Sequence, residues 1–193
     1  MNTAEKINHT VTRIISDHLA LHQRVAAVVT GNNMAPLFHK GDQIVAEAAP
    51  VTDIVPGDII MYQHRGTHCT HRFVTRISES VEIRIATKGD GWRHFDVPIH
   101  PDKLVGRVCM IHTKTGQMNL QAKRATRIQH LLGKLLRIEW QLIQQRPSCV
   151  AKIIVHLFHP INVICSHTER LIISIFQYNK INTAKTVIQE STP

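Results

Sequence analysis

The chain has 193 residues, a hydrophobic fraction of 43% and only 5% aromatic residues. This composition excludes a wholly disordered chain, and the length suits one moderate domain with an appendage or two small domains. The formal net charge of +9 is uneven, because residues 1–120 hold 13 Lys/Arg against 11 Asp/Glu whereas residues 121–193 hold 10 against 3. The basic C-terminal part indicates either an anionic partner or a solvated basic helical face.

Four cysteines are scattered along the chain without a Cys-x-x-Cys pair. Their spacing matches neither a disulfide framework nor a zinc site, so we expect free thiols in a reducing compartment. The first 30 residues include five charged side chains and no apolar run typical of a signal peptide. The most apolar later run, residues 153–165, is interrupted by two histidines and Pro160, and we expect it to be too short and too polar to span a bilayer. These features favour a cytoplasmic protein, in peripheral contact with a membrane at most.

Residues 3–22 place five aliphatic side chains at helical spacing, which predicts an amphipathic N-terminal helix that packs on the domain or lies on a membrane. From residue 24 to about 112, short strand-like runs are separated by turn signals, and the runs 73–77 and 81–85 alternate apolar and polar residues, as half-buried strands do. Short strands with frequent turns favour a small coiled β-barrel or sandwich. The predicted strands are 24–30, 43–48, 58–64, 70–78, 81–86 and 104–111.

The C-terminal third has a helical pattern. Thr115 and Gly116 close the β region, and residues 120–146 then carry a broad apolar stripe interleaved with Arg and Lys. Two further helices are predicted at 148–158 and 161–178, separated by Pro160. The polar residues 180–193 are expected to fray. The sequence therefore predicts a mainly β protein with α-helix in four parts: an N-terminal helix (1–23), a β domain (24–115), a basic helical region (116–180) and a tail (181–193).

One short motif stands between the first two predicted strands. Residues 31–37 read Gly-Asn-Asn-Met-Ala-Pro-Leu, and a Lys-Gly-Asp turn follows at 40–42. This order resembles the nucleophile motif of type I signal peptidases and of the related SOS-repressor peptidases. In those families the residue just before the Met is the nucleophilic Ser, and in this chain it is Asn33. The resemblance implies that a bound peptide lies beside Gly31, Asn32, Met34 and Pro36.

Four later segments extend the resemblance in the family's order. Residues 54–62 resemble its Gly-Asp-Ile-Val strand, and residues 70–74 resemble the His-Arg strand of the archaeal and endoplasmic-reticulum type. Residues 87–96 resemble the Lys-Gly-Asp segment of that type, and residues 104–108 resemble the closing Val-Gly-Lys/Arg-Val strand. The resemblance covers about residues 25–110, so the C-terminal region falls outside it.

By this resemblance His71 takes the position of the general base, Asp96 that of the acid that orients it, and Asp90 that of a supporting carboxylate. A Ser hydroxyl becomes a nucleophile when a base takes its proton, and a carboxylate holds the imidazole in the required tautomer. An Asn amide has no proton to give up at a useful pH, although it can hydrogen-bond to an imidazole and preserve the shape of the site. Each position also has a purely structural interpretation, since Asn and Asp are common turn residues and the chain has 14 histidines.

Other chemistry near His71 has weaker support in the sequence. Thr70 or Cys69 is an alternative nucleophile, but no pattern brings either to the imidazole. His64, His68, Cys69 and His71 suggest a metal site, but strand alternation divides them between two faces, so we expect no metal and no cofactor. The basic helices lack an aromatic platform for single strands, and few residues precede the β region, so we do not expect a nucleic acid partner.

The favoured hypothesis is a signal-peptidase-like domain that is inactive because Asn33 stands in place of Ser, and that keeps a groove for a peptide or precursor protein in extended conformation. Two alternatives stay open. In one, the chain is an active endopeptidase of signal or leader peptides, and Asn33 is an introduced or compensated substitution. In the other, it is an interaction protein that acts through its basic C-terminal helices.

Overall fold

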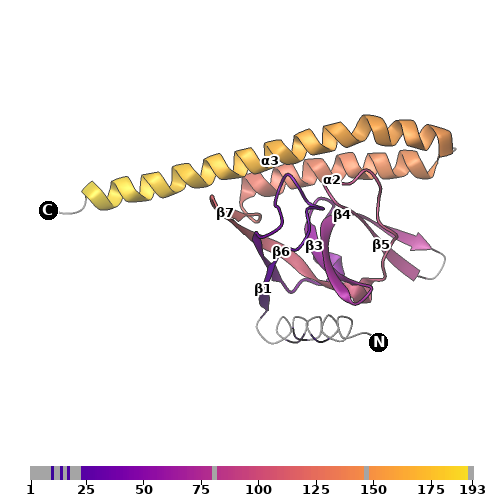
Figure 1. Ribbon diagram of the computed structural model, residues 1–193, viewed down its shortest axis with the longest axis horizontal. Coiled ribbons are helices and arrows are strands. Elements are labelled where there is room, and N and C mark those ends of the chain that lie inside the picture. Colours follow the sequence, from indigo (N-terminus) through magenta and orange to yellow (C-terminus); the bar gives the residue numbers. More distant parts are fainter. Residues whose placement is uncertain are drawn as a thin grey trace.

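The computed structural model describes residues 23–79, 82–145 and 148–190, together with Thr10, Ile14 and Asp17. Those three residues are helical, but the predicted N-terminal helix as a whole lies outside the described residues. A seven-stranded sheet is followed by two long helices that run together along one side of it (Figure 1). The elements are β1 (Arg24–Val28), β2 (Gln43–Glu47), η1 (Val51–Asp53), β3 (Ile59–His64), β4 (Thr67–Glu79), β5 (Glu82–Lys88), η2 (Pro101–Lys103), β6 (Leu104–Thr113), β7 (Gly116–Asn119), α2 (Lys123–Gln144) and α3 (Ser148–Glu190).

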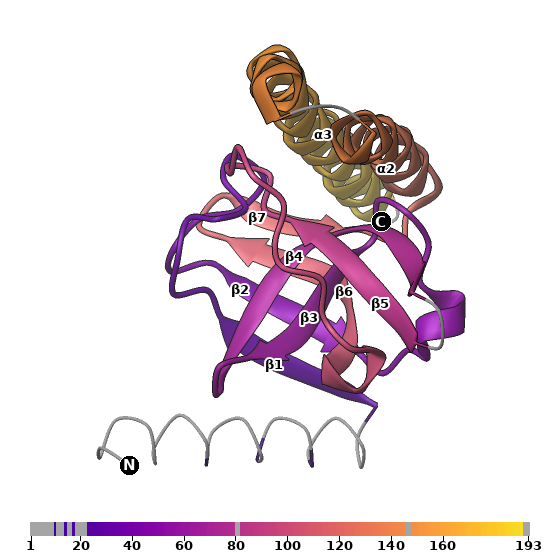
Figure 2. The same ribbon diagram turned by 90° about the vertical axis from the view of Figure 1, so that its right-hand side faces the viewer.

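All strand pairs of the described sheet are antiparallel, in the order β1-β2-β6-β3-β4-β5, with β7 paired to β6. Strand β6 pairs with β2 along one edge, and along its other edge it pairs first with β3 and then with β7. Figure 2 shows both helices above the same end of the β domain, far from β1. The prediction of a mainly β protein with C-terminal helices is therefore confirmed.

The six predicted strands are present, with ends shifted by a few residues. Strand β4 begins earlier than predicted because Arg65 and Gly66 take positive φ angles of 47° and 75°, which make a tight hairpin turn after β3. Strand β7 was not predicted. It has four residues, of which only Met118 is buried, so its alternation is too short to recognise. Gly116 therefore begins a strand, instead of closing the β region as expected.

The central strand β3 is buried on both faces. Ile59 and Met61 join a cluster with residues of β1, β2 and β6, whereas Ile60 and Tyr62 join a second cluster around Phe73. Successive residues of a strand point to opposite faces, so one strand supplies both clusters. The second cluster lies beside the position of His71, which pairs with Ile60 across the β3–β4 ladder.

Helix α2 is seated on the β domain by close backbone contact. Leu136 packs on Val74 and Ala86, which lie on β4 and β5. A Cβ atom added to Gly133 would lie 2.2 Å from the backbone carbonyl carbon of Pro56, so the helix approaches the turn before β3 as closely as glycine allows. Helix α2 thus sits directly against the strands that carry the predicted site.

Helix α3 is one continuous helix, so the prediction of two helices separated by Pro160 is wrong. Buried side chains on both sides of the proline, Val155, Asn162, Ser166 and Glu169, recur at helical spacing on one face. Their contacts favour an unbroken helix and offset the roughly 3 kcal/mol that an interior proline costs. The predicted frayed tail is also helical, as far as Glu190.

The continuity of α3 corrects a second expectation. The sequence predicts that the apolar run 153–165, interrupted by two histidines and Pro160, is too short and too polar to span a bilayer. In the structure Val150–Ile172 forms one helical stretch that is long and apolar enough to cross a membrane, by length and composition alone. Since one such helix is weak evidence of a span, its surroundings decide how it is interpreted.

Candidate functional site

The structure brings Asn33, His71 and Asp96 into one hydrogen-bonded row. Asn33 Nδ2 lies 3.2 Å from His71 Nε2, and His71 Nδ1 lies 2.6 Å from Asp96 Oδ2. The three residues come from the loop after β1, from β4 and from the loop after β5. The imidazole is 2% exposed. The three residues therefore lie in the order that the resemblance predicts for a nucleophile position, a base and an orienting acid.

Two further residues that the sequence analysis missed surround the Asp96 carboxylate. Thr87 Oγ1 donates a hydrogen bond of 2.6 Å to Asp96 Oδ2, and the Tyr62 hydroxyl donates one of 3.3 Å to the same oxygen. Burial raises the pKa of Tyr62, and the negative charge of Asp96 adds to the rise, so Tyr62 remains a protonated donor. Strand alternation could have pointed to Tyr62, because it pairs with Cys69, two residues before His71.

The hydrogen bonds are compatible with a His71 tautomer that carries its proton on Nδ1. If Nδ1 carries the proton toward Asp96, then Nε2 has a free lone pair that accepts the hydrogen bond of the Asn33 amide. A serine protease base has the same tautomer before it takes the proton of the serine. In that tautomer Nε2 of His71 faces an amide without an acidic proton.

A glycine-rich loop, residues 89–91, packs against the backbone carbonyl of Asn33. The backbone N–H of Gly91 donates to the Asn33 carbonyl at 2.9 Å. A Cβ atom on Gly89 would lie 2.7 Å from that carbonyl oxygen and 3.4 Å from His71 Nε2. The close approach explains why this loop needs glycine beside the site. Trp92 follows, and its ring centroid lies 5.4 Å from that of His71.

Asp90 faces away from His71 and into a buried charge cluster. It accepts two hydrogen bonds from Arg72, at 2.9 and 2.7 Å, and one of 2.8 Å from Ser166 of α3. Arg72 also donates to Glu169 of α3 at 2.8 Å. The predicted supporting carboxylate therefore joins the β domain to α3, and it supports the site only through its loop.

The charges of this cluster shift one another's protonation. Burial alone would lower the pKa of Arg72, but Asp90 and Glu169 outweigh it and raise that pKa above its ordinary value. Burial raises the pKa of Glu169 to about 7, Arg72 opposes this rise, and the charge of Asp90 adds to it. One fully buried cation thus faces two carboxylates, and the second of them, Glu169, is partly protonated near pH 7.

A second buried pair joins the same loop to α2. Lys88 Nζ lies 2.7 and 2.9 Å from the two carboxylate oxygens of Glu139, and Asn162 of α3 donates to Glu139 at 2.8 Å. Burial lowers the pKa of Lys88, and Glu139 opposes this. Lys88 also lies 4.6 Å from the centroid of the Phe95 ring. Helix α2 is therefore bound to Lys88, just before Gly89, and α3 to Asp90, just after it.

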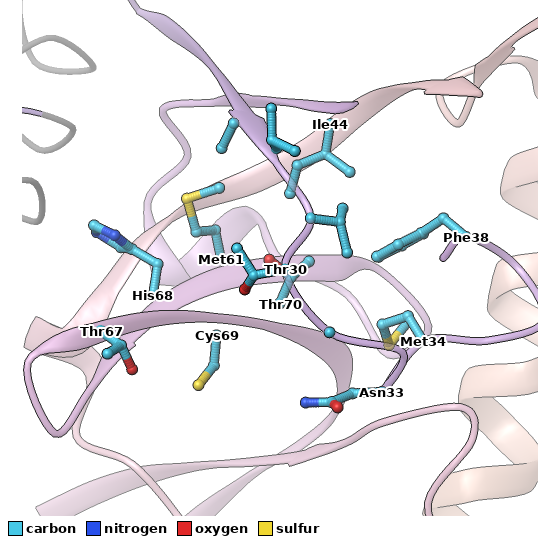
Figure 3. Close-up of a pocket in the computed structure, with 14 residues that line it drawn as sticks. Thr30, Asn33, Met34, Phe38, Ile44, Met61, Thr67, His68, Cys69 and Thr70 are labelled. Atoms are coloured by element: carbon cyan, nitrogen blue, oxygen red, sulfur yellow. The ribbon is translucent and has the colours of Figure 1, made fainter. Parts of the chain in front are cut away.

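A cavity of about 310 Å³ opens beside Asn33 (Figure 3). Its walls are residues 27–31, which are the end of β1 and the start of the loop after it, and residues 67–70 of β4, with apolar side chains of Met34, Phe38, Ile44 and Met61. In Figure 3, Asn33 and Met34 lie at one side of the cavity, and Thr67 and His68 lie at the opposite side. Of the predicted peptide-binding residues, Gly31 and Met34 line the cavity. Asn32 and Pro36 do not: Asn32 Oδ1 accepts a hydrogen bond from the Lys40 amide, and Pro36 is buried.

The alternative chemistry near His71 gains no support. Burial raises the pKa of the Cys69 thiol, and the charge of Asp96 raises it further, which disfavours the nucleophilic thiolate. Within residues 23–79, 82–145 and 148–190, no three His, Cys, Asp or Glu side chains are grouped so that they could hold a metal ion.

No family model matches the chain, and a search of curated protein sequences finds no match either.

Proposed function

We propose that this chain is a peptide-binding pseudo-peptidase: a domain with the coiled β-barrel or sandwich of the signal peptidase and SOS-repressor superfamily, in which an amide occupies the nucleophile position. One observation carries the proposal. Asn33, His71 and Asp96, which are separated by 38 and 25 residues in the chain, form a continuous row with contacts of 3.2 and 2.6 Å. The sequence motifs selected these three positions without knowledge of the fold.

The amide accounts for the loss of covalent catalysis. The base of a serine peptidase must receive a proton from the nucleophile, and an Asn side chain cannot release one at neutral pH. Asn33 instead donates a hydrogen bond to His71 that occupies the lone pair needed for catalysis. Only weak acceleration by binding would remain, as when a triad loses one member.

The cavity supports the binding role. Strand β1 pairs with β2 along one edge, and β4 pairs with β5 only from Arg72 onward. In the described sheet β1 pairs only with β2, and residues 67–71 of β4 pair only with β3, so each stretch has one unpaired edge. The end of β1 and the first residues of β4 both line the cavity. An extended peptide can add there as a further strand, through backbone hydrogen bonds, and place an apolar side chain among Met34, Ile44 and Met61. The expected ligand is therefore an unfolded segment with a small or medium apolar side chain beside Asn33.

The proposal is tested by restoring the nucleophile. We expect no cleavage of signal-peptide-like substrates by the unmodified chain, and cleavage that is at least roughly 100-fold faster with Asn33→Ser. The serine oxygen would lie one bond farther from His71 than the present amide nitrogen, so we expect a rate below that of an evolved peptidase. Adding His71→Ala to Asn33→Ser should remove the gained activity. Cleavage by the unmodified chain that requires His71 would overturn the proposal.

Binding is measured separately, so that a failed rescue can be interpreted. Trp92 is 46% exposed and lies beside His71, so its fluorescence should change when an extended peptide fills the cavity. A Trp92→Phe variant identifies the signal, because Trp140 is the only other tryptophan. Saturable binding without turnover supports the pseudo-peptidase, whereas no binding by any peptide of the panel contradicts it.

A further inference from the structure

The outer face of α3 carries a long apolar stripe, formed by six aliphatic side chains that are 36% to 64% exposed. The members of the apolar stripe are Val150, Ile153, Leu157, Ile161, Ile164 and Leu171. They recur every three or four residues, with one gap, so they lie on one side of the helix over about 32 Å. In Figure 1, α3 is the outermost element, with α2 and the sheet below it.

The opposite face of α3 is polar and is tied to the rest of the protein. Asn162 donates to Glu139, Ser166 donates to Asp90, and Glu169 accepts from Arg72. These residues are all buried. Of the most apolar 18 residues of this helix only 17% are buried, so the helix is not apolar because it fills a core. A helix with one buried, hydrogen-bonded face and one exposed apolar face is suited to lie on a surface rather than to span a bilayer.

The two helices present positive charge to solvent. Residues 121–193 contain three acidic residues, and two of them, Glu139 and Glu169, are buried in ion pairs with Lys88 and Arg72. The third is Glu190, at the end of α3. The exposed charged side chains described on α2 and α3 are all basic, namely Lys123, Arg127, Lys134, Arg137 and Lys152. The β domain thus pairs with two of the three acidic residues of the helical region and leaves the exposed cations of α2 and α3 in solvent.

We infer that the apolar stripe of α3 lies on the surface of a lipid bilayer that contains anionic lipids, with α3 parallel to the membrane plane. Aliphatic side chains of α3 enter the region between headgroups and acyl chains, and Lys152 of α3 with the exposed Lys and Arg side chains of the adjacent α2 attracts acidic headgroups. A second copy of the chain is a poorer occupant, because it would bring two basic surfaces together. The lipid surface requires nothing of the Asn33 site.

The test measures binding of the full chain to vesicles, by sedimentation, with phosphatidylcholine alone or with about 30% phosphatidylglycerol. We expect binding to the anionic vesicles that weakens as the salt concentration rises from about 0.1 M to about 0.5 M. The double variant Leu157→Gln with Ile164→Gln should lower the partition coefficient by roughly tenfold or more, because it removes apolar area from the interface. Both side chains are more than 60% exposed, so the fold should tolerate the change.

The matched control is Ile83→Gln with Val97→Gln, which changes two exposed aliphatic residues of the β domain, 49% and 77% exposed. This control should bind vesicles as the unmodified chain does. Equal loss in both double variants would overturn the inference, as would the absence of binding to anionic vesicles. A dimer in solution that the α3 variant dissociates would also overturn it and would assign the stripe to a contact between copies.

Discussion

Removing the charge of Glu169 from the buried cluster of Arg72, Asp90 and Glu169 should stabilise the protein. The pKa of Glu169 is raised from 4.5 to about 7 by burial, so the folded protein holds its proton more tightly than the unfolded chain does. Folding therefore gains from this group at low pH, and the gain is lost as the pH rises from about 4.5 to about 7. The difference between the two pKa values corresponds to about 3 kcal/mol of unfolding free energy.

The variant Glu169→Gln mimics the protonated carboxyl, and its amide oxygen can still accept from Arg72. We expect the variant and the unmodified protein to have similar stability at about pH 5, and the variant to be more stable by up to about 3 kcal/mol at about pH 8. Urea unfolding followed by circular dichroism at several pH values measures this difference. The chain's histidines titrate in the same range, and comparing the two proteins at each pH removes their common contribution.

Two further variants show whether the reasoning about this cluster holds. Asp90→Asn weakens the bidentate partner of a fully buried guanidinium, so we expect a loss of about 3 kcal/mol at all these pH values. Glu82→Gln breaks an exposed pair with Arg84 and should change stability by less than about 1 kcal/mol. A Glu169→Gln protein that is less stable than the unmodified one at about pH 8 would refute the argument, because it would mean that the cluster requires the second negative charge.

Two other predictions concern how the helices are attached. Lys88→Met and Glu139→Met should each cost about 3–5 kcal/mol in urea unfolding, because each leaves its partner charged and buried, whereas the double variant should recover most of the loss; additive losses would show that the pair is not coupled. Gly133→Ala should cost more than about 2 kcal/mol, because the new Cβ atom would meet the Pro56 backbone, and Leu131→Ala at an exposed position of the same helix should cost less than about 1 kcal/mol. Equal stability of these two alanine variants would mean that α2 is not seated as closely as the structure has it.

Much of the β domain could be predicted from local patterns. Alternation along β4 and β5 depends only on neighbouring residues, and it marked both strands, of which β4 carries His71. Strand β7 could not be predicted, because four residues are too few to show an alternating pattern. The helix break predicted at Pro160 is wrong, because the buried residues on both sides of the proline stabilise a continuous helix. Local preference fails where contacts distant in sequence outweigh it.

The site was predictable in part for the same reason. The motifs identified Asn33, His71 and Asp96, but no local pattern reveals Thr87 as a donor to Asp96. The contact of Asp90 with α3 could not be predicted from the sequence, because its partner Ser166 lies 76 residues away. A carboxylate in a turn gives no sign of the buried arginine or the distant helix that it binds.

The four residues from Lys88 to Gly91 change how deletion experiments must be interpreted. Lys88 binds α2, Asp90 binds α3, and Gly91 holds the Asn33 carbonyl between them. A chain shortened after Leu120 would leave Arg72 and Lys88 without their helical carboxylates, and Leu136 would no longer cover the strands beside the site. Loss of peptide binding after such a cut would therefore not assign the binding to the helices, because the cut removes the support of the groove at the same time. Point substitutions on the outer faces of α2 and α3 separate the two, since they leave both buried pairs in place.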